Sequence, residues 1–98
     1  MFARVTRYEK FDQDEAVRYA REQFIPAAQR SGGFEGMYVL VDPDGSGNAL
    51  ALTLWESREA MQASEQMGAS SREDVVRVAG GSVVDVERYE VALSPDQA

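Results

Sequence analysis

The chain has 98 residues, 44% of them hydrophobic and 28% charged, a composition typical of one globular domain with a single core. It contains neither cysteine nor histidine. This excludes disulfides and the commonest metal and haem ligands, so we expect no metal site and no cofactor. The net charge of −7 argues against nucleic acid and acidic lipid as partners. No apolar run approaches the roughly 18 residues of a membrane span. The first residues alternate like a strand and lack the layout of a signal peptide, and together with the absence of cysteine this leads us to expect a cytoplasmic protein.

The chain begins with a predicted strand over Phe2–Glu9. Polar and apolar residues alternate there, so that Arg4, Thr6 and Tyr8 share one face of the strand. A buried arginine requires a partner. If this face turns towards the helices, Arg4 is the best candidate for contact with an anion or oxyanion.

A helix is predicted over residues 13–30, with Asp12 as its N-cap. Residues 31–33, Ser-Gly-Gly, end this helix because glycine tolerates a positive φ. Pro26 removes one backbone donor late in the helix, so we expect a kink or a break near Gln23.

The rest of the chain predicts a hairpin, two helices and a last strand. The predicted elements are a strand over 34–41, a turn over 42–48, a strand over 49–55, a helix over 58–67, a short helix from Ser70 or Ser71 to Ala79, and a strand over 83–93. Gly68 is expected to separate the two helices. The order β-α-β-β-α-β predicts a ferredoxin-like α+β domain over residues 1–93, followed by a polar tail over 94–98. Right-handed crossovers place the first and third strands in the centre of a four-stranded antiparallel sheet, with the helices on one face.

The strand over 49–55 is apolar on both faces, which is typical of a strand buried on both sides. Leu50, Leu52 and Leu54 share one face, and Ala49, Ala51, Thr53 and Trp55 share the other. One face packs against the helices of the same chain. We therefore expect a homodimer that packs sheet against sheet through the leucine face.

Two segments resemble the antibiotic biosynthesis monooxygenase (ABM) family. Residues 33–39, Gly-Phe-Glu-Gly-Met-Tyr-Val, resemble the family's GF-x-G passage into the second strand. Residues 52–60, Leu-Thr-Leu-Trp-Glu-Ser-Arg-Glu-Ala, resemble its W-x-S-x-E-A passage from the third strand into the next helix. The resemblance implies a dimeric α+β barrel. It also implies a cofactor-independent monooxygenase that binds a small aromatic or polyketide-like molecule. A non-catalytic dimeric ligand-binding or structural module is the alternative.

Residues that the family's haem-degrading members carry are missing. The resemblance would place their strand asparagine, helix tryptophan and histidine near Thr6, Ser64 and Asp74. We therefore exclude haem degradation. The quinone-forming members need no metal or flavin, because the substrate anion itself reduces dioxygen. An asparagine that such enzymes carry shortly before the strand tryptophan is replaced by alanine here.

Arg4, Tyr38 and Trp55 are the candidate catalytic residues that follow from this resemblance. The expected ligand-binding residues are Thr6, Tyr8, Phe24, Ala51, Thr53 and Trp55.

Each of these candidates also has a structural interpretation. Trp55 could wall a pocket or plug the core. Arg4 could meet a ligand or form an ion pair with Asp85 or Glu87 at the barrel edge. Tyr38, like Tyr89, could donate into a pocket or pack at an interface. The small side chains at 49, 51 and 53 could leave room for a ligand or allow the first helix to approach closely.

Overall fold

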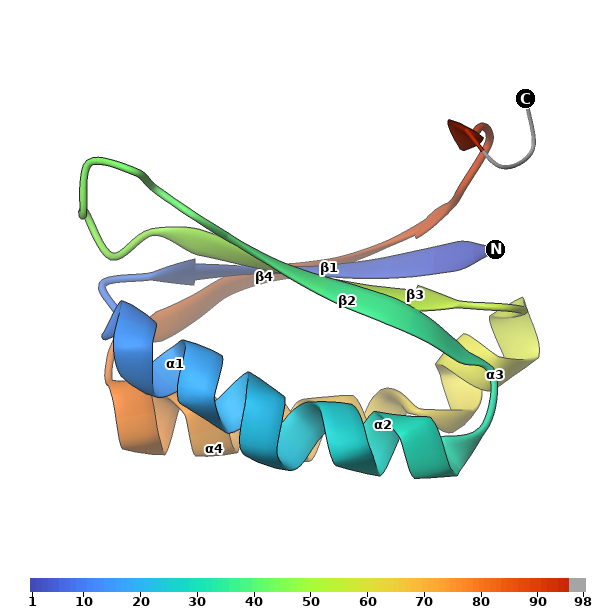
Figure 1. Ribbon diagram of the computed structural model, residues 1–98, viewed down its shortest axis with the longest axis horizontal. Helices are drawn as coiled ribbons and strands as arrows, with labels where there is room; N and C mark the ends of the chain where they lie inside the picture. Colours follow the sequence, from blue (N-terminus) through green and yellow to red (C-terminus); the bar gives the residue numbers. More distant parts are fainter. Residues whose placement is uncertain (96–98) are drawn as a thin grey trace.

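A four-stranded antiparallel sheet with helices on one face makes up the computed structural model, which describes residues 1–95 (Figure 1). The strands are β1 (Phe2–Glu9), β2 (Phe34–Val41), β3 (Ala49–Trp55) and β4 (Ser82–Glu90). Their order in the sheet is β2-β3-β1-β4, so β1 and β3 are central. This confirms the predicted ferredoxin-like α+β fold.

The helices form a single layer beneath the sheet in the view of Figure 1. They are α1 (Gln13–Tyr19), the π-helical segment η1 (Ala20–Phe24), α2 (Ile25–Ser31), α3 (Arg58–Ala63) and α4 (Glu65–Ala79). Asp12 caps α1 as predicted, because its side chain accepts a hydrogen bond from the backbone of Glu15. None of the helices in the described part of the chain is long and apolar enough to cross a membrane.

The first helix changes its winding where the sequence predicts a kink or a break. The π-helical segment includes Gln23 and ends shortly before Pro26. The buried residues along α1, η1 and α2 recur every four positions: Ala16, Ala20, Phe24 and Ala28. In a regular α-helix, a four-residue repeat drifts by about 40° at each step. The wider π-turn takes up part of this drift, so all four side chains face the sheet.

Two predicted boundaries are wrong. The break between α3 and α4 falls at Ser64, whereas Gly68 continues the helix. Strand β4 ends at Glu90 rather than Leu93, because its last partner is Phe2 at the beginning of β1. Of the predicted tail 94–98, residues 96–98 lie outside the described residues.

The core between sheet and helices consists of two apolar clusters. One is built around Tyr8 and Phe11, whose rings stack 5.5 Å apart. The other is built around Trp55 and Phe24. Arg4 is also buried in this layer.

No helix in the described part of the chain covers the opposite face of the sheet (Figure 1). Leu50, Leu52 and Leu54 are half-buried there, and Leu40 is 48% exposed. We call this surface the outer sheet face.

Candidate functional site

A partly open cavity of about 50 Å³ lies between the sheet and the helix layer. Its wall is mostly apolar. The lining residues are Arg4, Thr6 and Tyr8 from β1, Met37 and Val39 from β2, Ala51 and Thr53 from β3, Phe11 from the loop after β1, Ala16, Tyr19, Ala20 and Phe24 from the first helix, and Gly68, Ser71, Arg72 and Val75 from α4. An apolar hollow with a few polar groups is the usual form of a small-molecule site.

Most of the candidate residues from the sequence meet at this cavity: Arg4, Thr6, Tyr8, Phe24, Ala51 and Thr53. They come together because every second side chain of a strand points to the same side of the sheet. Residues that pair in register on neighbouring strands share that side. The register places Arg4 opposite Thr53 and Thr6 opposite Ala51. The small side chains on β3 therefore leave space in front of Phe24.

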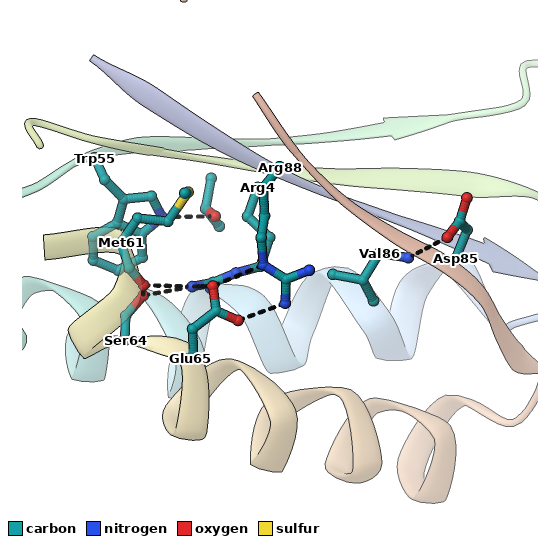
Figure 2. Close-up of polar contacts among 9 residues, drawn as sticks. Arg4, Trp55, Met61, Ser64, Glu65, Asp85, Val86 and Arg88 are labelled. Carbon is teal, nitrogen blue, oxygen red and sulfur yellow. Dashed lines mark hydrogen bonds and ion pairs between the residues drawn. The ribbon is translucent and has the colours of Figure 1, made fainter. Parts of the chain in front are cut away.

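Arg4 is the most buried charged residue of the site, with 3% of its surface exposed. Its Nη2 atom donates to the carbonyl oxygen of Met61 (2.8 Å), to Ser64 Oγ (2.8 Å) and to Glu65 Oε2 (3.0 Å), as Figure 2 shows. These groups lie where α3 ends and α4 begins, so Arg4 ties the central strand to the junction of the two helices.

The ion pair of Arg4 differs from the one that the sequence suggested. Its partner is Glu65 on α4, not Asp85 or Glu87 on β4. Asp85 and Glu87 pair in register with Arg7 and Val5, whose side chains point to the outer sheet face. They therefore lie on the wrong side of the sheet to reach Arg4.

Glu65 joins Arg4 to a second arginine at the edge of the sheet. Arg88 Nε donates to Glu65 Oε2 (2.9 Å) and Arg88 Nη2 donates to Glu65 Oε1 (2.6 Å), so the two residues form a bidentate ion pair. The hydrogen bond from Arg88 is the main cause that lowers the pKa of Glu65 to about 2, and Arg4 adds to it. Burial lowers the pKa of Arg4. The ion pair with Glu65 acts in the opposite direction but is the smaller effect. Arginine nevertheless stays charged in proteins, so Arg4 remains a cation.

Arg72 belongs to the cavity, although the sequence around it suggests an exposed helix start. A Cβ atom added to Gly68 would lie 2.8 Å from Arg4 Nη1 and 3.4 Å from Arg72 Nη1. The two guanidinium groups therefore flank Gly68. Gly68, Ser71, Arg72 and Val75 have the i, i+3, i+4, i+7 spacing of one helix face, and this was the signal in the sequence.

Trp55 lies beside the cavity, in the core, and not on its wall. It is fully buried, and its ring packs edge-on against Phe34 at 5.3 Å. Its Nε1 atom donates to Thr53 Oγ1 (3.0 Å), and the Arg4 guanidinium lies 5.7 Å from its ring centre. Trp55 thus supports two residues that do line the cavity.

Tyr38 is not part of the cavity, which corrects its grouping with Arg4. It is 61% exposed on the outer sheet face. The register of β2 shifts between Phe34 and Gly36, and one extra residue in a strand turns the following side chains to the opposite face. Tyr89 is also exposed, and its hydroxyl donates to Glu87 Oε2 (2.6 Å).

Two tyrosines on the cavity wall supply neutral hydroxyl groups. Burial raises the pKa of Tyr8 to about 12, against a smaller opposite effect of Arg72. The hydroxyl of Tyr19 donates to Asp74 Oδ2 (3.1 Å) and lies 3.3 Å from Ser71 Oγ, and burial raises its pKa as well. Both side chains are therefore suited to donate hydrogen bonds and poorly suited to accept a proton.

No cluster of three or more histidine, cysteine, aspartate or glutamate side chains that could hold a metal ion occurs within residues 1–95. The cavity itself offers guanidinium and hydroxyl groups. Its chemistry is that of a site that binds oxygen atoms carrying negative charge.

Residues 1–72 match the family model described as "Antibiotic biosynthesis monooxygenase". Two uncharacterized proteins of Mycobacterium tuberculosis, Rv2557 and Rv2558, are 34% and 35% identical over 81% and 82% of this chain. The chain spans about a third of the length of these curated relatives.

Solved structures share the fold at low sequence identity. SnoaB, a cofactor-independent oxygenase from Streptomyces nogalater, superposes with a TM-score of 0.71 at 14% identity, covering 96% of this chain and 95% of SnoaB. The monooxygenase ActVA-Orf6 of Streptomyces coelicolor, in complex with nanaomycin D, gives 0.68 at 18% identity, covering 96% and 91%. At these identities the likeness establishes the fold alone.

Proposed function

Because the chain belongs to the antibiotic biosynthesis monooxygenase family, we propose that its cavity binds a small aromatic or polyketide-like molecule and that the protein oxygenates this molecule without a cofactor. The observation that carries the proposal is the cavity itself, where a mostly apolar wall surrounds the buried cation of Arg4. Such a wall excludes water, and a fixed cation stabilises negative charge that develops on a ligand oxygen.

The proposed reaction needs only the substrate and dioxygen. An anthrone-like ring carbon loses a proton to solvent at the mouth, and the resulting anion gives its electrons to dioxygen to form a peroxide anion, which takes a proton back from solvent. Loss of water from the peroxide leaves a carbonyl group. The ring carbon thus exchanges two hydrogens for one oxygen atom, and the second oxygen atom leaves as water. Arg4, Tyr8 and Thr6 line the place where the oxyanion would lie.

The size of the cavity limits how a ring can bind. A closed cavity that holds benzene measures about 150 Å³, three times the space found here. We therefore propose that the oxygen-bearing edge of the ring enters and that the remainder lies in the mouth. A ligand of several rings requires side chains at the mouth to move.

A second candidate, a ligand-binding module without catalysis, is favoured by one observation. Within the described part of the chain, the residues that line the cavity include no carboxylate and no histidine to accept a proton near neutral pH. The tyrosines on the wall have raised pKa values.

Oxygen uptake distinguishes the two functions. Dithranol, an anthrone, and substituted hydroquinones are incubated with the protein, and dioxygen consumption is compared with the rate without protein. We expect one dioxygen to be consumed for each carbonyl group formed from dithranol. Arg4→Lys, which keeps the charge but replaces the guanidinium group with a single amine, is expected to lower kcat roughly tenfold or more while the protein stays folded by circular dichroism. Arg30→Gln is the control, because Arg30 is exposed. Uptake at the protein-free rate by a protein that binds these compounds would establish the module instead.

We also propose that a second copy of the chain covers the outer sheet face. Proteins of this family are typically dimeric. The face carries Leu50, Leu52 and Leu54, and burial of apolar area drives association. Sedimentation velocity at micromolar concentration should give a dimer, and Leu52→Glu should give a monomer. Val78→Glu, which adds the same charge on exposed α4, should remain dimeric. A monomeric unmodified protein refutes this interface. The cytoplasm remains the proposed location.

A further inference from the structure

Among the described residues, the side chains that line the cavity carry positive charge and no negative charge. Two lining residues, Arg4 and Arg72, are cations, and none is an aspartate or glutamate. The whole chain has 17 acidic and only 10 basic residues. The charged residues of the cavity wall are therefore all basic, whereas the charged residues of the whole chain are mostly acidic.

The two cations converge on one point. Because Gly68 has no side chain, Arg4 Nη1 and Arg72 Nη1 both lie within 3.4 Å of the place that its Cβ would occupy. Glycine inside a helix is less favourable than alanine. Gly68 therefore lowers the stability of α4, but its missing side chain leaves room for the two guanidinium groups to lie close together.

Neighbouring carboxylates leave this pair with a surplus of positive charge. Glu65 is shared between Arg4 and Arg88. Arg72 has no ion-pair partner within residues 1–95. Nη2 of Arg4 makes all of its hydrogen bonds to the described residues, its Nε is completely buried without a partner, and Nη1 lies against Gly68 on the cavity wall. One buried cation thus keeps a free donor next to a second, half-buried cation.

We infer that the cavity anchors its ligand through a carboxylate group held by Arg4 Nη1 and Arg72. This inference rests on the proposed function, since it names the chemical class of the ligand at the same cavity. Two guanidinium groups around one point match the two oxygens of a carboxylate, and charge-assisted hydrogen bonds of this kind are the strong ones. A carboxylate also fits a space that admits only one edge of a ring. The ligand class is a small carboxylic acid, with the rest of the molecule towards the mouth.

Benzoate and benzamide test the inference, because they have nearly the same shape and differ in charge. Each is titrated into the isotope-labelled protein, and the backbone amide resonances of Gly68 and Ser71, which line the cavity, are followed by NMR. We expect benzoate to bind at least about tenfold more tightly than benzamide, since a hydrogen bond to a charged group is worth more than one to a neutral group. Equal affinity for the two compounds refutes the carboxylate anchor and leaves a neutral aromatic site intact. Binding of neither compound refutes the proposed ligand site as well.

Arg72→Gln supplies the matching variant. Arg72 makes no ion pair within residues 1–95, so its removal should leave the fold unchanged. The preference for benzoate over benzamide should fall in Arg72→Gln, where Arg4 alone remains, and stay unchanged in Arg30→Gln, which removes the same charge from an exposed helix position. An undiminished preference in Arg72→Gln, or an equal decrease in Arg30→Gln, overturns the inference. In the second case, the overall charge of the protein would account for the effect.

Discussion

Replacing Glu65 by glutamine removes the carboxylate that Arg4 and Arg88 share. The hydrogen bonds from these arginines hold the pKa of Glu65 at about 2, compared with an ordinary value of 4.5. One pKa unit corresponds to about 1.4 kcal/mol, so the carboxylate contributes up to about 3 kcal/mol to the free energy of unfolding at neutral pH. Its side chain is 30% exposed. Solvent screening therefore reduces the expected loss in Glu65→Gln to about 2 kcal/mol.

The pH dependence of stability gives a second measure of the same interaction. A carboxyl group whose pKa is lowered by folding stabilises the protein above its ordinary pKa. This stabilisation is lost as the pH falls from about 4.5 towards about 2. The difference in unfolding free energy between the unmodified protein and Glu65→Gln should therefore be largest at pH 7 and shrink by more than half at about pH 3.

Urea unfolding followed by circular dichroism measures both effects. The protomer concentration is held constant because association changes apparent stability. Glu73→Gln is the matched control, since Glu73 is exposed on the same helix, and it should change stability by less than about 0.5 kcal/mol. If Glu65→Gln costs no more than this control, or if its cost is the same at pH 7 and pH 3, the ion-pair network does not stabilise the fold as described.

Three further substitutions test the packing around the cavity. Gly68→Ala should lower the thermal unfolding temperature, because the new Cβ would lie 2.8 Å from Arg4 Nη1; a rise, as helix propensity alone predicts, would show that the guanidinium moves freely. Folding raises the pKa of Tyr8 to about 12, and the contribution of this shift to the free energy of unfolding is complete below pH 10. The contribution is lost as the pH rises towards 12. Urea unfolding of Tyr8→Phe should therefore show a smaller alkaline loss, and an equal loss in both proteins would contradict the raised pKa. Trp55→Phe removes the hydrogen bond to Thr53 and part of the core. Urea unfolding followed by circular dichroism should show a loss of about 2 kcal/mol in the free energy of unfolding. Unchanged stability would contradict the place of Trp55 in the core.

The fold could be predicted in outline because its signals are local. Alternation in β1 placed Arg4, Thr6 and Tyr8 on one face, and the handedness of crossovers placed β1 and β3 in the centre. The helix break was misplaced for a tertiary reason. From the sequence, Gly68 predicts a helix break. In the structure it lies inside the helix, because the guanidinium of Arg4 occupies the space where a side chain would be.

The candidate site was less predictable because two of its determinants are not local. The face on which Tyr38 lies depends on the irregular pairing between Phe34 and Gly36, and residue alternation does not reveal that irregularity. Arg72 stands beside Glu73 and Asp74, which suggests exposed helix surface. Only the approach of α4 to the sheet shows that Arg72 belongs to the cavity.

The π-helical segment Ala20–Phe24 lets the first helix accept a change in length. Ala16 before it lines the cavity, whereas Ala28 after it packs in the cluster around Trp55. A regular α-helix of the same length would turn Ala28 about 120° away from the direction of Ala16, whereas a helix one residue shorter would bring the two within about 20°. Removing one residue from the segment would therefore restore regular winding and keep both alanines on the sheet side. Homologues that lack this residue should have a regular first helix and the same two core clusters, so the segment has the geometry of a one-residue insertion that the core absorbs.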